Sequence, residues 1–121
     1  MADELTEKII GAAIEVHRYL GPGLLESIYE EALCHELSLR GVPATRQVAV
    51  DIHYKGIAIK GQRLDLLVEN SVVVEIKSVR ELPDVAMAQT LSYLKATGLK
   101  RALLINFGKN TLIDGLKRIS L

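Results

Sequence analysis

Residues 61–78 read GQRLDLLVENSVVVEIKS. This stretch predicts two strands and a tight connection, because Leu64–Val68 and Val72–Ile76 are nearly continuous apolar runs of the kind found in strands buried on both faces. Each run contains one acid, Asp65 in the first and Glu75 in the second. Burying an ionised carboxylate without a partner costs several kcal/mol. We therefore expect a positive charge, such as a divalent cation, to compensate the two acids.

The length of the connection decides whether the two acids share a face. Directly opposed residues of paired strands point the same way. A three-residue loop, Glu69–Ser71, opposes Asp65 to Glu75, whereas a two-residue turn, Asn70–Ser71, places them on opposite faces. Asn70 tolerates the left-handed conformation that such loops often use. We therefore predict the three-residue loop.

The hairpin also carries a lysine, Lys77, two positions after Glu75 and hence on the same face of the strand. An Asp followed by Glu-x-Lys is what metal-dependent phosphodiester hydrolysis needs. Two hard carboxylates can hold Mg²⁺ or Mn²⁺, and the lysine can orient or deprotonate the attacking water. The hairpin alone leaves a second interpretation open, an ordinary strand pair with solvated Glu75 and Lys77 near its end.

Length and composition restrict the class of protein. With 121 residues, 49% of them hydrophobic, we expect a single compact domain over residues 1–121. Fifteen basic and fifteen acidic residues give zero net charge, which argues against a general basic coat for nucleic acid but not against a local patch. Cys34 is the only cysteine, so an internal disulfide is excluded and a packing role is expected. The chain shows no membrane-length apolar run and no signal peptide, so we expect a cytoplasmic protein.

Two helices are predicted before the strands. The first, Leu5–Leu20, has apolar residues at helical spacing and ends at Gly-Pro-Gly; His17 lies beside its apolar stripe, as a boundary histidine or a ligand. The second, Leu24–Arg40, is followed by a glycine. On this helix we expect Glu26 to border the apolar face and the later acids to point outward. A first-turn glutamate that only favours the positive helix terminus is the alternative.

The rest of the chain alternates strands with one helix. We expect strands at Thr45–Tyr54, from near Ile57 into the hairpin with a break at Gly61, at Ala102–Phe107 as a buried parallel strand, and at Thr111–Ile119. A helix from Asp84, as its cap, to Thr97 ends at Gly98. Its Gln89 and Tyr93 share one face, a spacing that lets both address one ligand, although a helical tyrosine also commonly packs in the core.

Taken together, these elements resemble the αβββαβ core of the PD-(D/E)xK nuclease superfamily: an α/β, restriction-endonuclease-like fold with a central mixed sheet flanked by helices, here with an extra N-terminal helix. Within it the chain is similar to the GxxExxY family, whose motif corresponds to Gly23, Glu26 and Tyr29. Gln89 and Tyr93 match the QxxxY motif of RecB-like exonucleases. The resemblance covers nearly the whole chain, through VHRYLGPGLLESIYEEAL, RLDLLVENSVVVEIKSV, AQTLSYLKATGL and INFG.

The resemblance implies roles for these residues. Asp65 and Glu75 would be the metal ligands, Lys77 the catalytic lysine and Glu26 the acid of the first core helix. RecB-like relatives often place a histidine at the metal, and His17 is the residue that we nominate for it.

One position departs from the superfamily pattern. Leu64 stands where a proline or glycine usually precedes the first acid, and this does not remove the ligand. Two functions from different classes remain: a Mg²⁺- or Mn²⁺-dependent nuclease acting on DNA or RNA, and a non-catalytic nuclease-fold module that binds a nucleotide, nucleic acid or protein. Because a small neutral nuclease has little surface to hold its substrate, we also expect a homodimer.

Overall fold

The computed structural model describes residues 3–121. In chain order its elements are α1 (Glu4–Leu20), α2 (Glu26–Leu39), β1 (Ala44–Tyr54), β2 (Ile57–Val68), β3 (Val72–Lys77), α3 (Asp84–Thr97), β4 (Arg101–Asn106), a 3₁₀ turn (Ile113–Gly115) and β5 (Leu116–Ser120). The α/β architecture predicted from the sequence is confirmed. None of the helices in the described part of the chain is long and apolar enough to cross a membrane.

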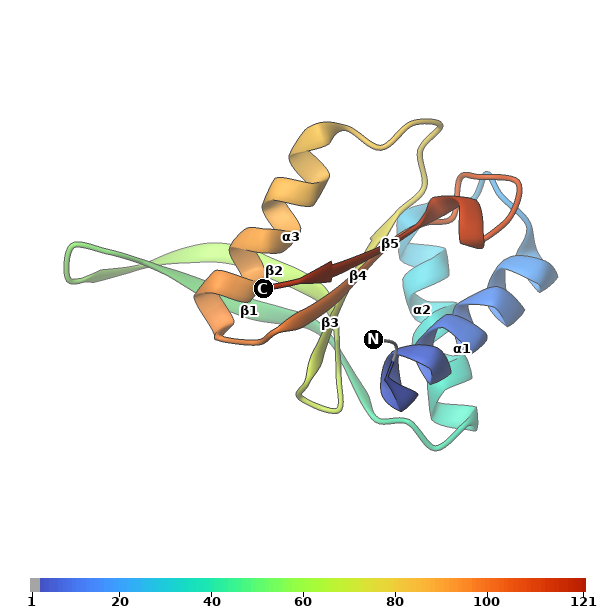
Figure 1. The fold of residues 1–121 in the computed structure, drawn as a ribbon, viewed down its shortest axis with the longest axis horizontal. Coiled ribbons are helices and arrows are strands. Elements are labelled where there is room, and N and C mark those ends of the chain that lie inside the picture. Colours follow the sequence, from blue (N-terminus) through green and yellow to red (C-terminus); the bar gives the residue numbers. More distant parts are fainter. Residues whose placement is uncertain (1–2) are drawn as a thin grey trace.

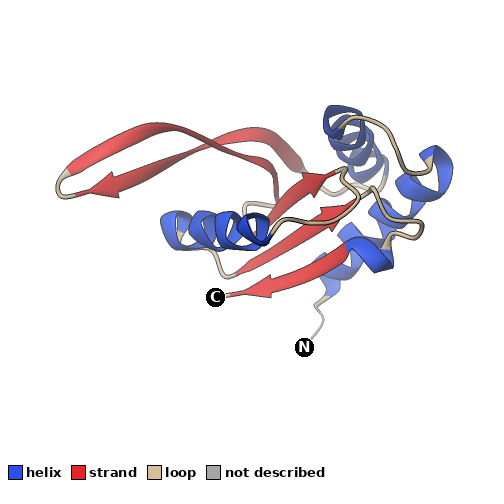
Figure 2. Ribbon diagram, turned by 90° about the horizontal axis from the view of Figure 1, so that it is seen from above, coloured by secondary structure: helices blue, strands red, loops and turns tan. Residues whose placement is uncertain are grey.

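The five strands form one mixed sheet in the order β1-β2-β3-β4-β5. Only β3 and β4 are parallel among these neighbours; the other pairs are antiparallel. The parallel pair is joined by α3, the crossover that such a connection requires. Figures 1 and 2 show α1 and α2 together on one side of the sheet and α3 on the other.

Each layer of helices closes its own apolar core. Ile9, Tyr29 and Leu33 of α1 and α2 pack with Val74 of β3 in one cluster. Leu94 of α3 packs in a second cluster against the opposite face. Burial of apolar surface at about 25 cal/mol per Å² is the main term that holds these layers to the sheet. Cys34 is half-buried against the first cluster, as expected of a packing residue.

The central hairpin has the predicted register. Val68 pairs with Val72, which leaves a three-residue loop, and the Ser71 N–H donates to the Val68 carbonyl at 3.0 Å. Asn70 adopts the left-handed conformation, with φ 53°, as predicted, and Glu69 does so as well, with φ 50°.

Besides one-residue shifts at the ends of other elements, three predicted boundaries need correction. α2 begins at Glu26 rather than Leu24. Asp84 is the first residue of α3 rather than its cap; Pro83 holds the cap position, without a side-chain hydrogen bond. The last predicted strand is shorter, because a 3₁₀ turn occupies part of the segment before Leu116–Ser120.

A fourth correction concerns Gly61, which does not end a strand. β2 continues through it, and the register with β1 shifts instead between Val50 and Ile52. Gly61 has φ 118°, a conformation that L side chains rarely adopt, so a glycine allows the strand to absorb an extra residue as a bulge.

Candidate functional site

The two strands of the central hairpin separate just before the predicted site. β2 and β3 pair from Val68–Val72 to Leu66–Val74. Beyond that point β2 stays paired with β1, and β3 stays paired with β4 as far as Lys77. The backbone groups at the divergence therefore need partners other than the backbone of the opposite strand.

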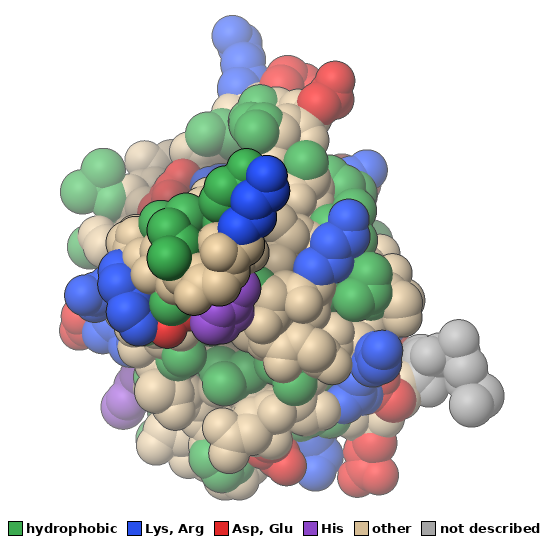
Figure 3. Space-filling view, turned by 90° about the vertical axis from the view of Figure 1, so that its left-hand side faces the viewer, with side chains coloured by type: hydrophobic (Ala, Val, Ile, Leu, Met, Phe, Trp, Pro, Cys, Tyr) green, Lys and Arg blue, Asp and Glu red, His purple; other side chains and the backbone are tan. Residues whose placement is uncertain are grey.

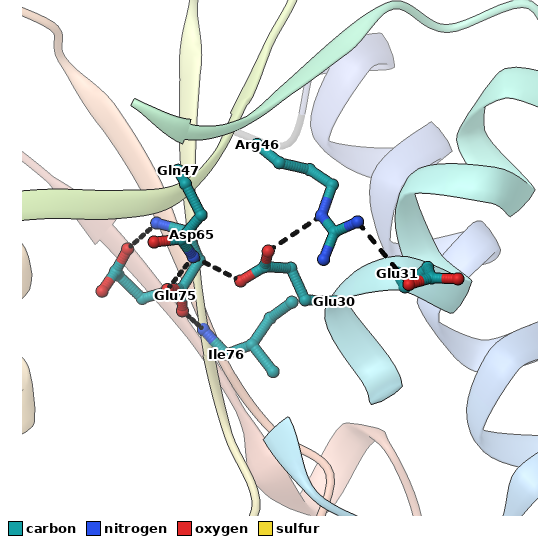
Figure 4. A network of polar contacts seen from close by, with 7 residues as sticks. All are labelled: Glu30, Glu31, Arg46, Gln47, Asp65, Glu75 and Ile76. Carbon is teal, nitrogen blue, oxygen red and sulfur yellow. Dashed lines mark hydrogen bonds and ion pairs between the residues drawn. The ribbon is translucent and has the colours of Figure 1, made fainter. Parts of the chain in front are cut away.

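Asp65 and Glu75 occupy this divergence and provide those partners. The Asp65 N–H donates to Glu75 Oε2 at 2.7 Å, and the Ile76 N–H donates to Asp65 Oδ2 at 2.8 Å. Each carboxylate thus binds the backbone of the other strand (Figure 4). The expected juxtaposition of the two acids is present in the structure.

The surroundings of the two acids disfavour their charged forms. Glu75 is 4% exposed, and burial, followed by the charge of Asp65, raises its pKa to about 8. Burial also raises the pKa of Asp65. The charge of Lys77 opposes both rises, but less strongly than burial promotes them. The pair is therefore short of positive charge, which is the electrostatic condition that a bound cation relieves.

A third acid, Glu30 of α2, reaches the pair through a glutamine. Glu30 is 6% exposed and accepts hydrogen bonds from Arg46 Nε at 2.9 Å and Gln47 Nε2 at 2.7 Å. Gln47 Nε2 also lies 3.4 Å from Asp65 Oδ1 (Figure 4). The charge of Glu30 contributes to the raised pKa values of Asp65 and Glu75. Gln47 has φ 52°, a left-handed conformation that is uncommon outside glycine and turns its backbone at this point.

The expectation that Glu26, rather than Glu30, borders the apolar face of α2 is wrong. Glu26 is exposed, and Glu30 is the buried acid one turn later. The apolar residues that suggested the opposite orientation, Leu25 and Ile28, are 72% and 46% exposed. Glu26 instead lines an open surface pocket of about 840 Å³ together with Ser78, the residue that follows Lys77.

The tyrosine of the Gly23, Glu26, Tyr29 motif has a structural position. Tyr29 is fully buried, its hydroxyl donates to the Gly21 carbonyl, and the Leu24 N–H donates to the hydroxyl at 3.1 Å. Its ring stacks on Phe107 with centroids 4.5 Å apart. These contacts fix the loop that leads into α2.

The segment after Lys77 is held by two further contacts. Ser78 Oγ donates to the Leu24 carbonyl at 2.6 Å. The buried Asn106 side chain accepts from the Val79 N–H at 3.0 Å and donates to the Val79 carbonyl at 2.9 Å. The end of β3 is therefore anchored both to the loop before α2 and to the end of β4.

α3 brings Tyr93 toward the acids. Tyr93 is 3% exposed; its pKa is raised by burial and then by the charges of Glu75 and Asp65, and the side chain of Gln89 opposes that rise. Gln89 and Tyr93 therefore lie together, on the helix that covers the face of the sheet opposite α2. Lys77, half-buried at the end of β3, acts electrostatically on the same two acids.

His17 lies in a different environment. Its ring Nε2 is 2.9 Å from the carbonyl oxygen of Lys109, and its ring centroid is 6.1 Å from that of Phe107. Among the polar contacts of the described residues, none joins His17 to Asp65 or Glu75. The structure therefore places this histidine as a tie between α1 and the loop after β4.

Sequence reasoning missed Glu30, Gln47 and Asn106. Glu30 stands three and seven positions before the buried Leu33 and Leu37, a spacing that would have placed it on the inner face of the helix. Asn106 is the last residue of an apolar strand and is buried. A polar side chain at such a position is expected to have hydrogen-bond partners inside the protein. No comparable sequence pattern predicts that Gln47 lies at the site.

The donor set of the site fits a hard divalent cation. Asp65 and Glu75 offer only oxygen donors, the type that Mg²⁺ and Mn²⁺ prefer, and their pKa values are raised by burial first and by neighbouring acids second. Within residues 3–121 no group of three or more His, Cys, Asp or Glu side chains is arranged to hold a metal ion. With two protein ligands, the remaining positions around such a cation would fall to water and substrate.

The comparison with protein-family models agrees with the fold. A family model described as the PD-(D/E)XK nuclease superfamily matches residues 3–119, so the chain belongs to that superfamily. Members of the superfamily generally use divalent metals and act on nucleic acid. No curated protein matches the chain. A solved structure titled "Crystal structure of SSO0001" is 20% identical, with a TM-score of 0.49, over 98% of this chain and 78% of that one.

Proposed function

We propose that this chain is a Mg²⁺- or Mn²⁺-dependent nuclease that hydrolyses phosphodiester bonds of DNA or RNA. The observation that carries the proposal is the pair Asp65 and Glu75, two carboxylates held against each other at the point where β2 and β3 separate, with Lys77 on the same strand. Such a pair costs stability, and a protein without a use for it has no reason to retain it.

Each residue of the site has a role in this proposal. Asp65 and Glu75 would hold the cation, which when bound activates water and offsets phosphate charge. Lys77 would orient the attacking water through its ammonium group. The backbone N–H groups of Asp65 and Ile76 hold the two carboxylates in place. Glu30, acting through Gln47, would orient Asp65, as residues behind metal ligands commonly do.

Further roles are proposed for the residues around this centre. Gln89 and Tyr93 would contact the substrate from α3, in keeping with the QxxxY motif. Glu26 would act from the mouth of the pocket beside Ser78, in keeping with the GxxExxY motif. The homodimer stays a prediction, which sedimentation at working concentration tests directly: a monomer only would contradict it.

One observation favours a second candidate, a non-catalytic module that binds nucleotide, nucleic acid or protein. Asp65 already accepts hydrogen bonds from the Ile76 N–H and the Gln47 side chain. Glu75 already accepts one from the Asp65 N–H, and Glu30 already pairs with Arg46. A network satisfied in this way can serve structure alone.

A cleavage assay separates the two candidates. Labelled DNA and RNA are incubated with the protein and Mg²⁺ or Mn²⁺, beside Glu75→Gln and Lys77→Met. We expect cleavage by the wild type, none by either variant, and Mn²⁺ binding retained by Lys77→Met, since the lysine is not a ligand. Equal cleavage by the wild type and Glu75→Gln, or none by the wild type with either metal, would contradict the nuclease.

A further inference from the structure

The hairpin formed by β1 and β2 extends well beyond the helices. Every residue from 53 to 63 is exposed, and Figures 1 and 2 show the far end of the hairpin reaching past α3 into solvent. Tyr54, Ile57 and Ile59 are 57%, 59% and 46% exposed. We call residues 52–63 the arm. Two strands that protrude in this way gain little from the core, so their side chains are free to contact a partner.

The arm has two chemically different faces. Tyr54 pairs with Ile57, and Ile52 with Ile59, so these four apolar side chains share one face. Asp51 and Lys60, the next residues along the two strands from Ile52 and Ile59 on the side away from the turn, form an ion pair at 2.5 Å. The apolar face is thus formed by cross-strand pairs, as in a stable two-stranded ribbon.

The charges of the arm are all basic. Lys55, Lys60 and Arg63 fall within residues 52–64, a stretch without any acid, in a chain whose net charge is zero. Lys55 Nζ lies 5.4 Å from the centre of the Tyr54 ring, beside the turn. Figure 3, which looks at the molecule from the side of the arm, shows hydrophobic, histidine and basic side chains gathered there. Because Lys60 is paired with Asp51, the positive charge that the arm offers to a partner comes from Lys55 and Arg63, for which the described residues show no ion pair.

The arm leads directly to the candidate site. Arg63 stands two residues before Asp65 on β2, and the bulge at Gly61 lies between Arg63 and the tip. At ~3.3 Å per residue, β2 from Ile57 to Asp65 extends about 26 Å. Basic groups on the arm can therefore meet phosphates up to about eight base pairs from a phosphodiester bond at the acids, since duplex DNA rises 3.4 Å per base pair.

We propose that the arm binds double-stranded DNA, as a two-stranded ribbon that enters a groove beside the bond to be cut. This inference rests on the proposed nuclease function and names the substrate class of the same site. The major groove of B-DNA admits a two-stranded ribbon, and its phosphates complement the basic residues of the arm. The deep, narrow major groove of A-form RNA does not admit such an element. The apolar face of the arm suits the methyl groups and sugars that line the DNA groove.

The test measures binding without cleavage. Affinity for a fluorescent DNA duplex of about 20 base pairs is followed by anisotropy in EDTA, at 50 to 200 mM salt, for the wild type and for a Lys55→Gln, Arg63→Gln double variant. Lys60 is left in place because Asp51 already neutralises it. The matched control is Lys100→Gln, Lys117→Gln, which removes two exposed cations near the opposite edge of the sheet.

The expected result follows from counterion release. Losing two phosphate contacts lowers the slope of log affinity against log salt by about 1.8, so over this range the wild type should lose about tenfold more affinity than the arm variant. The control should behave as the wild type, and duplex RNA of the same length should bind more weakly and equally to wild type and arm variant. Unchanged melting temperatures confirm that all variants fold.

Three results would overturn the inference. If the arm variant has the same slope of log affinity against log salt as the wild type, the arm does not contact phosphates. If the variant loses as much affinity for duplex RNA as for duplex DNA, the arm does not bind in a DNA groove. Sedimentation showing that the arm variant dissociates a dimer would identify a second copy of the chain as the partner instead. The binding assay is done in EDTA without metal, so a failure of the arm to bind DNA would not contradict the proposed cleavage. A wild type that binds the DNA duplex but never cleaves it would contradict the proposed nuclease and not the binding by the arm.

Discussion

The β2–β3 hairpin has two halves that are built on opposite principles. In the paired half, Leu66, Val68, Val72 and Val74 are completely buried, and a regular ladder of backbone hydrogen bonds joins the strands. In the separated half, Asp65 and Glu75 replace that ladder with hydrogen bonds from side chain to backbone. The first half stabilises the fold, and the second keeps charge in a place where charge is unfavourable. The residues that stabilise the fold and the residues of the candidate site therefore occupy adjacent parts of the same pair of strands.

The pH dependence of stability should show the largest effect of the separated half. Because the folded pKa of Glu75, about 8, is raised above the ordinary 4.5, the folded state holds its proton more tightly than the unfolded chain does. The metal-free protein should therefore be most stable below about pH 4.5 as far as this group is concerned, and lose up to about 1.4 kcal/mol per pH unit toward pH 8. Asp65, whose pKa is also raised, adds in the same direction.

Urea unfolding in EDTA at several pH values measures this effect, with Glu75→Gln as the comparison. The variant keeps the shape of the side chain and removes the titration, so its slope should be much smaller and its stability at pH 8 equal to or above that of the wild type. A wild type that gains stability from pH 5 to pH 8 relative to Glu75→Gln would show that the acids are stabilising.

The paired half should respond to the loss of volume instead. Leu66→Ala removes a fully buried side chain from the apolar cluster between the sheet and the helices α1 and α2, and should cost about 2–5 kcal/mol, with no dependence on metal. Denaturant unfolding with and without Mn²⁺ measures it. If Leu66→Ala changes Mn²⁺ affinity more than it changes stability, the two halves are not separate.

Gln47→Ala should produce an intermediate effect, confined to the site. It removes the link between Glu30 and Asp65, so the carboxylate of Asp65 loses one of the groups that orient it. We expect metal affinity to fall about 10- to 100-fold, the usual result of losing a group behind a metal ligand. Calorimetric titration with Mn²⁺ checks this, and Gln62→Ala, on the exposed arm, serves as the matched control.

Glu26 and Glu30 should differ although they lie one turn apart. Glu26→Gln alters an exposed side chain and should change stability by less than about 0.5 kcal/mol. Glu30→Gln alters a buried acid that holds Arg46 and Gln47, and should have the larger effect on both stability and metal affinity. Thermal melting of the two variants side by side, with and without Mn²⁺, decides the order; a larger metal effect in Glu26→Gln would reverse the assignment made from the geometry.

The sequence predicted the hairpin and the parallel strand that follows the crossover helix, because those features depend on local signals. Asn70 accepts a left-handed conformation, and the apolar runs on either side allow one register that keeps both acids on a shared side. The parallel strand β4 followed from its continuous apolar residues and from the helix before it. Asp65 and Glu75 were found because a carboxylate inside an apolar run needs a reason.

The parts that could not be predicted depend on tertiary contacts. The apolar residues of α2 were compatible with more than one orientation, because Leu25 and Ile28 suggested a different inner face from Leu33 and Leu37. In the observed orientation Tyr29 stacks on Phe107, a residue far away in the sequence. Gln47 reaches Asp65 only because its backbone turns at a positive φ that no neighbouring glycine announces. Pattern reading therefore located the metal-ligand candidates, and missed the residues that hold them.

The most direct test of the central claim is calorimetric titration of the wild type and Glu75→Gln with Mn²⁺ near pH 7, repeated in two buffers of different ionisation enthalpy. The account predicts that Mn²⁺ binds the wild type with release of protons, because the pKa of Glu75 is about 8 and the cation displaces the proton that this carboxyl retains. Binding should be much weaker in Glu75→Gln, without that release. Equal Mn²⁺ binding by the two proteins, or none by the wild type, would contradict a cation site at Asp65 and Glu75.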